Sequence, residues 1–161
     1  MTNFLYVKIL EYSVVCIYIS NLKKSLFNFM PMTHEQKFVI DYDMKRASAS
    51  LIWTFISTPN GLAEWFADDV EKDGKQYTFY WKKASQKANL LAIRTGQYVR
   101  FRWEETEIPK SYFEIRIMNS EITGSRSLQI TDFAVDEDEQ KEMVDLWNKQ
   151  IAVLKRVLGC S

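Results

Sequence analysis

From Lys37 onward, the chain repeats short runs in which apolar and polar residues alternate. In the first run, residues 37–42, Phe38, Ile40 and Tyr42 share one face. A period of two residues is typical of a β-strand with one buried side. Further strands are predicted at residues 70–72, 75–81, 88–93, 97–103, 112–118 and 125–135. Strands with one wet face indicate an antiparallel sheet that has a single apolar side.

The hydrophobic period changes to that of a helix in three places. Leu51, Ile52 and Phe55 recur at helical spacing in residues 48–57, which end at the breaker cluster of residues 58–61. A short helix is predicted next, at residues 62–67. The third and longest helix, residues 137–158, begins with acidic residues and ends with basic ones, as the helix dipole favours.

The long final helix carries an apolar stripe with one polar member. Residues 137–158 would extend about 33 Å, enough to cross a small domain. The stripe consists of Met143, Leu146, Trp147, Gln150, Leu154 and Val157. Such a helix is expected to lie on the apolar side of the sheet, and this arrangement can leave a cavity between the two. Gln150 would then be hydrogen-bonded in the core or directed into that cavity.

Composition and charge restrict the class of protein. A chain of 161 residues has room for one domain with a substantial core. Its 21 basic residues balance its 21 acidic residues, so no overall field attracts nucleic acid, and no nucleic-acid partner is expected. Cys16 and Cys160 lack metal-type spacing, and His34 is the only histidine. We therefore expect reduced cytoplasmic thiols, an exposed His34, no metal site and no cofactor.

The first 31 residues do not follow the strand pattern. They are apolar but interrupted by charges, and the longest uncharged piece, residues 12–22, is shorter than the roughly 20 residues of a membrane-spanning helix. We interpret residues 1–31 as an appendage, such as an upstream in-frame translation, and residues 32–161 as the working domain. A weak membrane-surface anchor is the competing interpretation, and no stable membrane insertion is expected.

Several segments together resemble a known superfamily. They are residues 51–53 with 58–59 and 62–66, residues 98–103, residues 131–133, and the helix that contains Leu146, Trp147 and Leu154. In these segments the chain resembles the START-like, or SRPBCC, superfamily, and is similar to its small bacterial members and to the activator-of-heat-shock-ATPase branch. The resemblance implies an α+β helix-grip fold of about seven strands, in the order β-α-α-β6-α, in which a curved antiparallel sheet wraps the carboxyl-terminal helix.

The first functional hypothesis is a binding module for a small apolar or amphipathic molecule. The ligand would lie in a pocket of a few hundred Å³ between the sheet and the last helix, a volume common for ligand sites. The candidate ligand-binding residues are Trp65, Tyr77, Phe79, Trp81, Phe101, Trp103, Phe113, Trp147, Gln150 and Leu154. The alternative for these residues is that they fill a solid core, as aromatic stripes commonly do.

The second hypothesis is a protein-interaction or co-chaperone-like module that uses the outer face of the sheet. The residues predicted for this face are Tyr80, Tyr98, Arg100, Arg102, Tyr112 and Arg116. The alternative is a solvated face with cross-strand pairs such as Arg102 with Glu114. A solid interior would favour this second hypothesis over ligand binding.

An enzyme is the third and weakest hypothesis, since no set of nucleophile, base and orienting residue can be named. Asp68 and Asp69 are paired carboxylates in the sequence, but adjacent acids at a helix end are commonly a solvated cap or turn. No catalytic residue is therefore assigned.

Overall fold

Seven antiparallel strands form one curved sheet. The computed structural model describes residues 36–45, 47–106, 108–120 and 124–160. The strands are β1 (Gln36–Asp43), β2 (Asp69–Asp73), β3 (Gln76–Trp81), β4 (Ala84–Arg94), β5 (Tyr98–Trp103), β6 (Phe113–Asn119) and β7 (Arg126–Ala134). The interpretations of residues 1–31, His34 and Cys16 lie outside the described residues.

The sheet joins the beginning and the end of the domain. Its order is β1-β7-β6-β5-β4-β3-β2, so β2 to β7 form a meander and β1 adds to its far edge. In the β1–β7 ladder, Phe38 lies opposite Asp132 and Ile40 opposite Ile130. The chain therefore crosses from β1 to β2, at opposite edges, through the two helices that lie between them.

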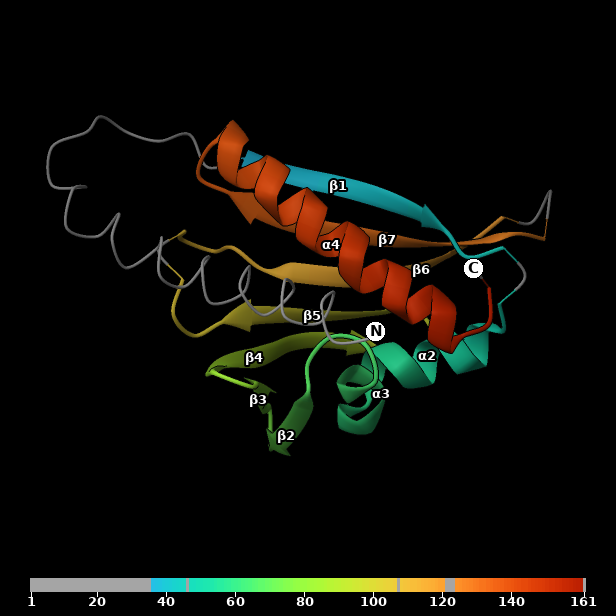
Figure 1. The fold of residues 1–161 in the computed structure, drawn as a ribbon, viewed down its shortest axis with the longest axis horizontal. Coiled ribbons are helices and arrows are strands. Elements are labelled where there is room, and N and C mark those ends of the chain that lie inside the picture. The colour runs from blue at the N-terminus through green and yellow to red at the C-terminus, as the bar shows by residue number, and fades with distance from the viewer. Residues whose placement is uncertain (1–35, 46, 107, 121–123, 161) are drawn as a thin grey trace, which may run out of the picture.

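Three helices complete the domain: α2 (Ala49–Ser57), α3 (Pro59–Ala63) and α4 (Glu137–Val157). Figure 1 shows α4 lying across one face of the sheet, with α2 and α3 near its carboxyl-terminal end. The predicted α+β architecture, with about seven strands and a long last helix, is confirmed. Asp136 caps α4, since its side chain accepts a hydrogen bond from the Glu139 backbone N–H, and three acidic residues follow in the first turn.

The short helix was predicted in the wrong place. It spans Pro59–Ala63 rather than residues 62–67, because the proline-containing cluster starts a helix as well as ending one. A proline is tolerated in the first turn, where its missing N–H has no helical partner. Thr58 supplies the cap, as its Oγ1 accepts a hydrogen bond from the Gly61 N–H at 3.0 Å.

Strand β4 is longer than predicted. It starts at Ala84 rather than residue 88, because residues 84–87 pair with β3 although they lack an apolar pattern. A shift of register between Leu90 and Ala92 also interrupts its alternation where it meets β5. Other strand boundaries differ from prediction by at most one residue.

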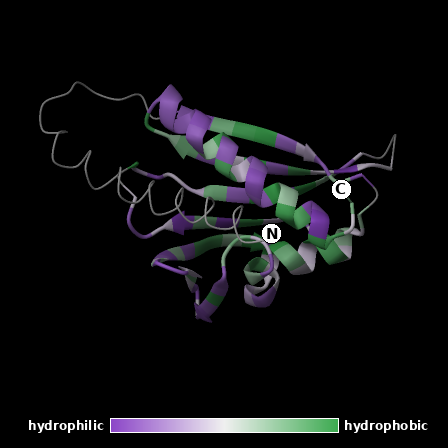
Figure 2. Cartoon of the chain, in the orientation of Figure 1, coloured by the Kyte–Doolittle hydropathy of each residue, from purple (hydrophilic) through white to green (hydrophobic). Residues whose placement is uncertain are grey.

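Helix α4 packs its stripe onto the sheet, with two corrections to the prediction. Trp147, Gln150 and Leu154 are buried as predicted, and Ile151 is buried with them although it was not assigned to the stripe. Val157 was assigned to it but is 40% exposed. Leu154, three residues earlier, is fully buried and Leu158, the next residue, packs against the core, so Val157 lies on the outward side of the last turn. Apolar and polar residues alternate around α4 in Figure 2, as expected for a helix with one buried side.

Candidate functional site

The ten predicted ligand-binding residues converge on the face of the sheet that α4 covers. Trp65 follows α3, three residues lie on β3, two on β5, one on β6 and three on α4. Seven of the ten are buried aromatic or aliphatic residues, Gln150 is a buried polar residue, and Trp81 and Trp103 are partly buried and pack against the core. The structure therefore brings the whole predicted set together.

A residue that was not predicted, Phe66, lies at the centre of this group. Its ring centroid is 5.4 Å from that of Trp65, 5.2 Å from Phe79 and 5.8 Å from Phe113. It is also 5.7 Å from Trp147 on α4 and 6.3 Å from Trp103. Such distances are typical of favourable aromatic pairs. The ring of Phe66 thus occupies the space between the sheet and α4, where a ligand was expected.

Side chains from both layers also hold the Phe66 backbone. The Trp81 Nε1–H of β3 donates to the Phe66 carbonyl oxygen at 3.3 Å, and the Gln150 amide of α4 donates to the same oxygen at 3.4 Å. Gln150 is therefore hydrogen-bonded in the core, which is one of the two predicted alternatives. Both bonds are long for their type, so they fix the segment between α3 and β2 only moderately.

A buried carboxylate fastens α4 to the sheet. The Trp147 Nε1–H donates to Asp132 Oδ2 at 2.9 Å, while Asp132 Oδ1 accepts from the Phe133 backbone N–H. Burial raises the pKa of Asp132 from 3.8 to about 7, although both hydrogen bonds oppose this shift. Asp132 was not among the candidate residues. The alternation of Leu128 and Ile130 places it on the inward side of β7, but an acidic residue is ordinarily exposed.

Two hollows in the described part of the chain lie outside the pocket that was expected between the sheet and α4, and Trp103 alone of the ten predicted residues lines one of them. One hollow, of about 170 Å³, is lined by residues including Ser85, Trp103 and Glu104. The other, open and of about 560 Å³, is lined by Lys45, Ala47 and Ser48 and by the residues that follow α4, Leu158, Gly159 and Cys160. The Phe66 ring fills the space in which the pocket was expected.

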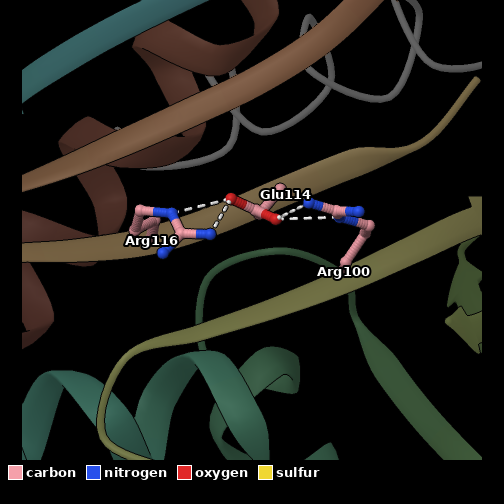
Figure 3. Close-up of polar contacts among 3 residues, drawn as sticks. All are labelled: Arg100, Glu114 and Arg116. Carbon is pink, nitrogen blue, oxygen red and sulfur yellow. Dashed lines mark hydrogen bonds and ion pairs between the residues drawn. The ribbon is translucent and has the colours of Figure 1, made fainter. Parts of the chain in front are cut away.

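The outer face of the sheet carries a buried ion-pair network (Figure 3). Glu114, which is 5% exposed, lies between two arginines. Arg100 Nε and Nη2 donate to Glu114 Oε2 at 2.8 and 2.6 Å. Arg116 Nε and Nη2 both donate to Glu114 Oε1 at 2.8 Å. The predicted pairing of Glu114 with Arg102 is therefore wrong, because the strand register sets Arg100 directly opposite Glu114.

The remaining candidate acids have local structural roles. Asp68 accepts a hydrogen bond from the Lys82 backbone N–H at 2.9 Å, and Asp69 accepts one from the Val70 N–H at 2.8 Å. Within the described ranges, no three His, Cys, Asp or Glu side chains are arranged to hold a metal ion. None of the described helices is both long enough and apolar enough to cross a membrane.

Comparison with solved structures supports the fold. BfR322 from Bacteroides fragilis is 39% identical, with a TM-score of 0.56 over 76% of this chain and 90% of that chain. The Aha1 dimer structure from Colwellia psychrerythraea is 14% identical, with a TM-score of 0.63 over 76% of this chain and 96% of that chain. CalU16 from Micromonospora echinospora is 16% identical, with a TM-score of 0.62 over 80% of each chain.

Among proteins with curated functions, none matches this chain. The START-like superfamily domain matches residues 32–160, which include every helix and strand described above. The seven-stranded sheet and the long helix across it are the helix-grip fold of that superfamily. The chain therefore belongs to the START-like superfamily.

Proposed function

We propose that this chain binds a small apolar or amphipathic molecule between the sheet and α4, in the space that the Phe66 ring fills when no ligand is bound. The observation that carries the proposal is the position of this ring, in contact with five aromatic residues from the sheet, α4 and the preceding turn. A ligand of similar size and chemistry would find the same neighbours. START-like domains bind small molecules, which supports this class of function.

The segment that carries Phe66 is the part of the wall best suited to move. Phe66 lies between the end of α3 at Ala63 and the start of β2 at Asp69, outside any helix or strand. Its displacement would break the two long side-chain hydrogen bonds to its carbonyl oxygen and the bond from its N–H to the Leu62 carbonyl oxygen at 2.8 Å, but no strand ladder. A turn outside the strand ladders opens at a lower free-energy cost than the core elements.

Two polar groups would then be available to an amphipathic ligand. If Phe66 moved away, the hydrogen bond from the Gln150 amide to its carbonyl oxygen would break, and this amide on α4 could then donate to the ligand. Asp132, which is bonded to Trp147, would supply a carboxyl group nearby. An apolar wall with a few polar groups is the usual composition of a small-molecule site.

A thermal-shift screen with fatty acids, sterols and aromatic metabolites tests the proposal. A ligand that binds only the folded state raises its melting temperature in a dose-dependent way. We expect at least one compound to do so, and to shift the NMR signals of Trp147, Gln150 and residues 64–67. If no compound raises the melting temperature, or if the signals that shift lie on the outer sheet face, the proposal is wrong.

Variants at Phe66 sharpen this test. Phe66→Leu shortens the side chain that competes with the ligand, so a compound that raises the melting temperature should bind this variant more tightly. A gain of about 1.4 kcal/mol in binding free energy would lower the Kd about tenfold. Phe38→Leu is the matched control, since Phe38 is also buried but lies on β1. That control should lose stability without a gain in affinity. An equal gain in both variants would indicate binding to a loosened core.

A protein-interaction role on the outer sheet face is the second candidate. It is favoured by the filled interior and by the ordered arginines around Glu114. We propose no catalytic residue. The cytoplasmic location, the absence of a nucleic-acid partner and the boundary of the domain at Met32 stay predictions.

A further inference from the structure

We propose that the outer face of strands β5 and β6 binds an acidic segment of a partner protein, through the exposed edges of Arg100 and Arg116. This inference rests on the second candidate function and is independent of ligand binding on the opposite face of the sheet.

Both guanidinium groups are fixed before any partner binds. Each makes two hydrogen bonds to one oxygen of Glu114. Each also lies over a tyrosine ring, Arg100 at 4.2 Å from the Tyr112 centroid and Arg116 at 4.1 Å from that of Tyr98. Side chains that are already ordered lose less conformational entropy on binding, and this raises affinity.

Among the described residues, the two groups keep donors that make no hydrogen bond and that point away from Glu114. A guanidinium group has five N–H donors, and the bonds to Glu114 use those of Nε and one of Nη2. The side chains of Arg100 and Arg116 remain 33% and 30% exposed, whereas that of Glu114 is only 6% exposed. Glu114 therefore orients the two arginines but does not bond the N–H donors on the far side of each guanidinium group. Those donors are spaced to bind the two oxygens of another carboxylate.

The surrounding charge favours an acidic partner. The cluster of Arg100, Glu114 and Arg116 carries one net positive charge. Arg94 and Arg102 lie on the same face, since they pair with Tyr98 and Asn89 in the β4–β5 ladder, and neither forms an ion pair within the part of the chain that the structure describes.

The carboxylates of the outer face lie at its margins. Glu104 lies two residues beyond Arg102, just after the end of β5, and accepts a hydrogen bond from Gln76 at 3.5 Å. Asp41 is on β1 and accepts a hydrogen bond from Gln129. Glu71 is on the edge strand β2 and accepts one from Tyr80. The middle of the face is therefore basic although the whole chain has no net charge.

The tyrosines argue for a protein segment rather than single-stranded RNA. RNA-binding sheets use open aromatic faces on which bases stack. Here the rings of Tyr98 and Tyr112 each have a guanidinium group over one face. The groups that this face offers to a partner are therefore oriented guanidinium N–H donors, which can bind the carboxylates of Asp and Glu side chains.

Fluorescence anisotropy with a short labelled peptide of alternating Glu and Ser tests the inference on the full chain. We expect saturable binding that weakens as salt is added, because salt screens exposed charges. The NMR signals of the Arg100 and Arg116 Nε–H groups should shift, while those of Trp147 and Gln150 should not. The same peptide with Gln in place of Glu should not bind.

Charge-conserving variants separate recognition from simple attraction. Arg100→Lys and Arg116→Lys keep the charge but lose the planar fork, so each should weaken peptide binding by about tenfold. Arg102→Gln should weaken it several-fold, whereas Lys83→Gln, an exposed change in the β3–β4 turn, should have little effect. Thermal melts establish that each variant is folded.

Three results would overturn the inference: no saturable binding at low salt, equal affinity for the Lys variants and the original chain, or tighter binding of poly(U) than of the acidic peptide. A fatty acid or sterol that raises the melting temperature would leave it untouched, because that ligand would lie on the other side of the sheet. The two proposals can therefore fail separately.

Discussion

At the scale of single residues, two buried acids are stabilised in different ways. Glu114 is 5% exposed and faces two guanidinium groups, whereas Asp132 is 7% exposed and is bonded only to the N–H groups of Trp147 and Phe133. A buried charge without a cation is costly, which favours the neutral acid. Asp132 thus tends toward protonation near neutral pH, and the nearby Glu139 carboxylate adds to this tendency.

The raised pKa of Asp132 predicts a pH-dependent stability. Between pH 3.8 and about 7, the folded chain holds a proton on Asp132 that the unfolded chain has lost. The free energy of unfolding should therefore fall as pH rises through this range, by up to about 1.4 kcal/mol per pH unit from this group. Asp132→Asn removes the titration, so its stability relative to the original chain should increase from pH 4 to pH 8.

Urea unfolding at several pH values measures this difference. Asp145→Asn, a change of an exposed carboxylate on α4, is the control and should give a difference that varies little with pH. A stability difference for Asp132→Asn that stays constant with pH would mean that Asp132 has an ordinary pKa in the folded chain.

At the scale of elements, the sequence pattern predicted the number and order of the strands and helices described above, and the errors lay in the ends of β4 and the position of the short helix α3. Alternation marked the buried sides of β1, β3, β5 and β6, because these strands have one apolar side. Residues 84–87 of β4 are polar or small, so only pairing with β3 makes them a strand. The start of α3 depends on the Thr58 cap, which a breaker signal alone cannot distinguish from a turn.

The corner between α2 and α3 predicts a sensitive glycine. A Cβ atom on Gly61 would lie 2.2 Å from the Thr54 carbonyl oxygen and 2.6 Å from the Phe55 Cα, both backbone atoms of α2. Gly61→Ala should push the helices apart and lower the free energy of unfolding by about 1 to 3 kcal/mol or more. Asn60→Ala, an exposed neighbour, should cost much less. Similar urea midpoints for both variants would contradict this contact.

The start of α4 predicts a smaller effect. Asp136 accepts from the Glu139 N–H at 2.8 Å, while the Glu139 side chain accepts from the Val135 N–H. Asp136→Ala should therefore destabilise the chain by about 1 kcal/mol. Asp138→Ala removes a neighbouring acid whose ion pair with Lys141 is exposed, so it should change stability by only a few tenths. Thermal melts of the two variants compare the losses, and equal losses would exclude a specific cap.

At the scale of the whole molecule, β1 closes the domain by pairing with β7 over their full lengths. This ladder joins residues about ninety positions apart in the sequence. Its second strand, β7, leads directly into α4. The match to the START-like superfamily begins at residue 32, shortly before β1.

The position of β1 predicts that a chain beginning at Met32 folds by itself. It should be expressed, melt cooperatively and have a melting temperature within a few degrees of that of the full chain, since it keeps the sheet, its core and α4. Differential scanning calorimetry of both chains makes the comparison. A drop of many degrees would show that residues 1–31 contribute to the folded domain.

The sequence by itself determined the element order, the apolar faces and ten residues that lie in or against the core between the sheet and the helices. The order and the faces follow from the local periodicity of apolar residues, and from the resemblance of several segments of this chain to one superfamily. Tertiary structure alone decided that Phe66 fills the space predicted for a ligand and that Asp132 is buried. It also decided that Glu114 pairs with Arg100 and Arg116 rather than Arg102. The physical reason is that strand register and the packing of a turn against distant rings depend on contacts between segments, which no local pattern records.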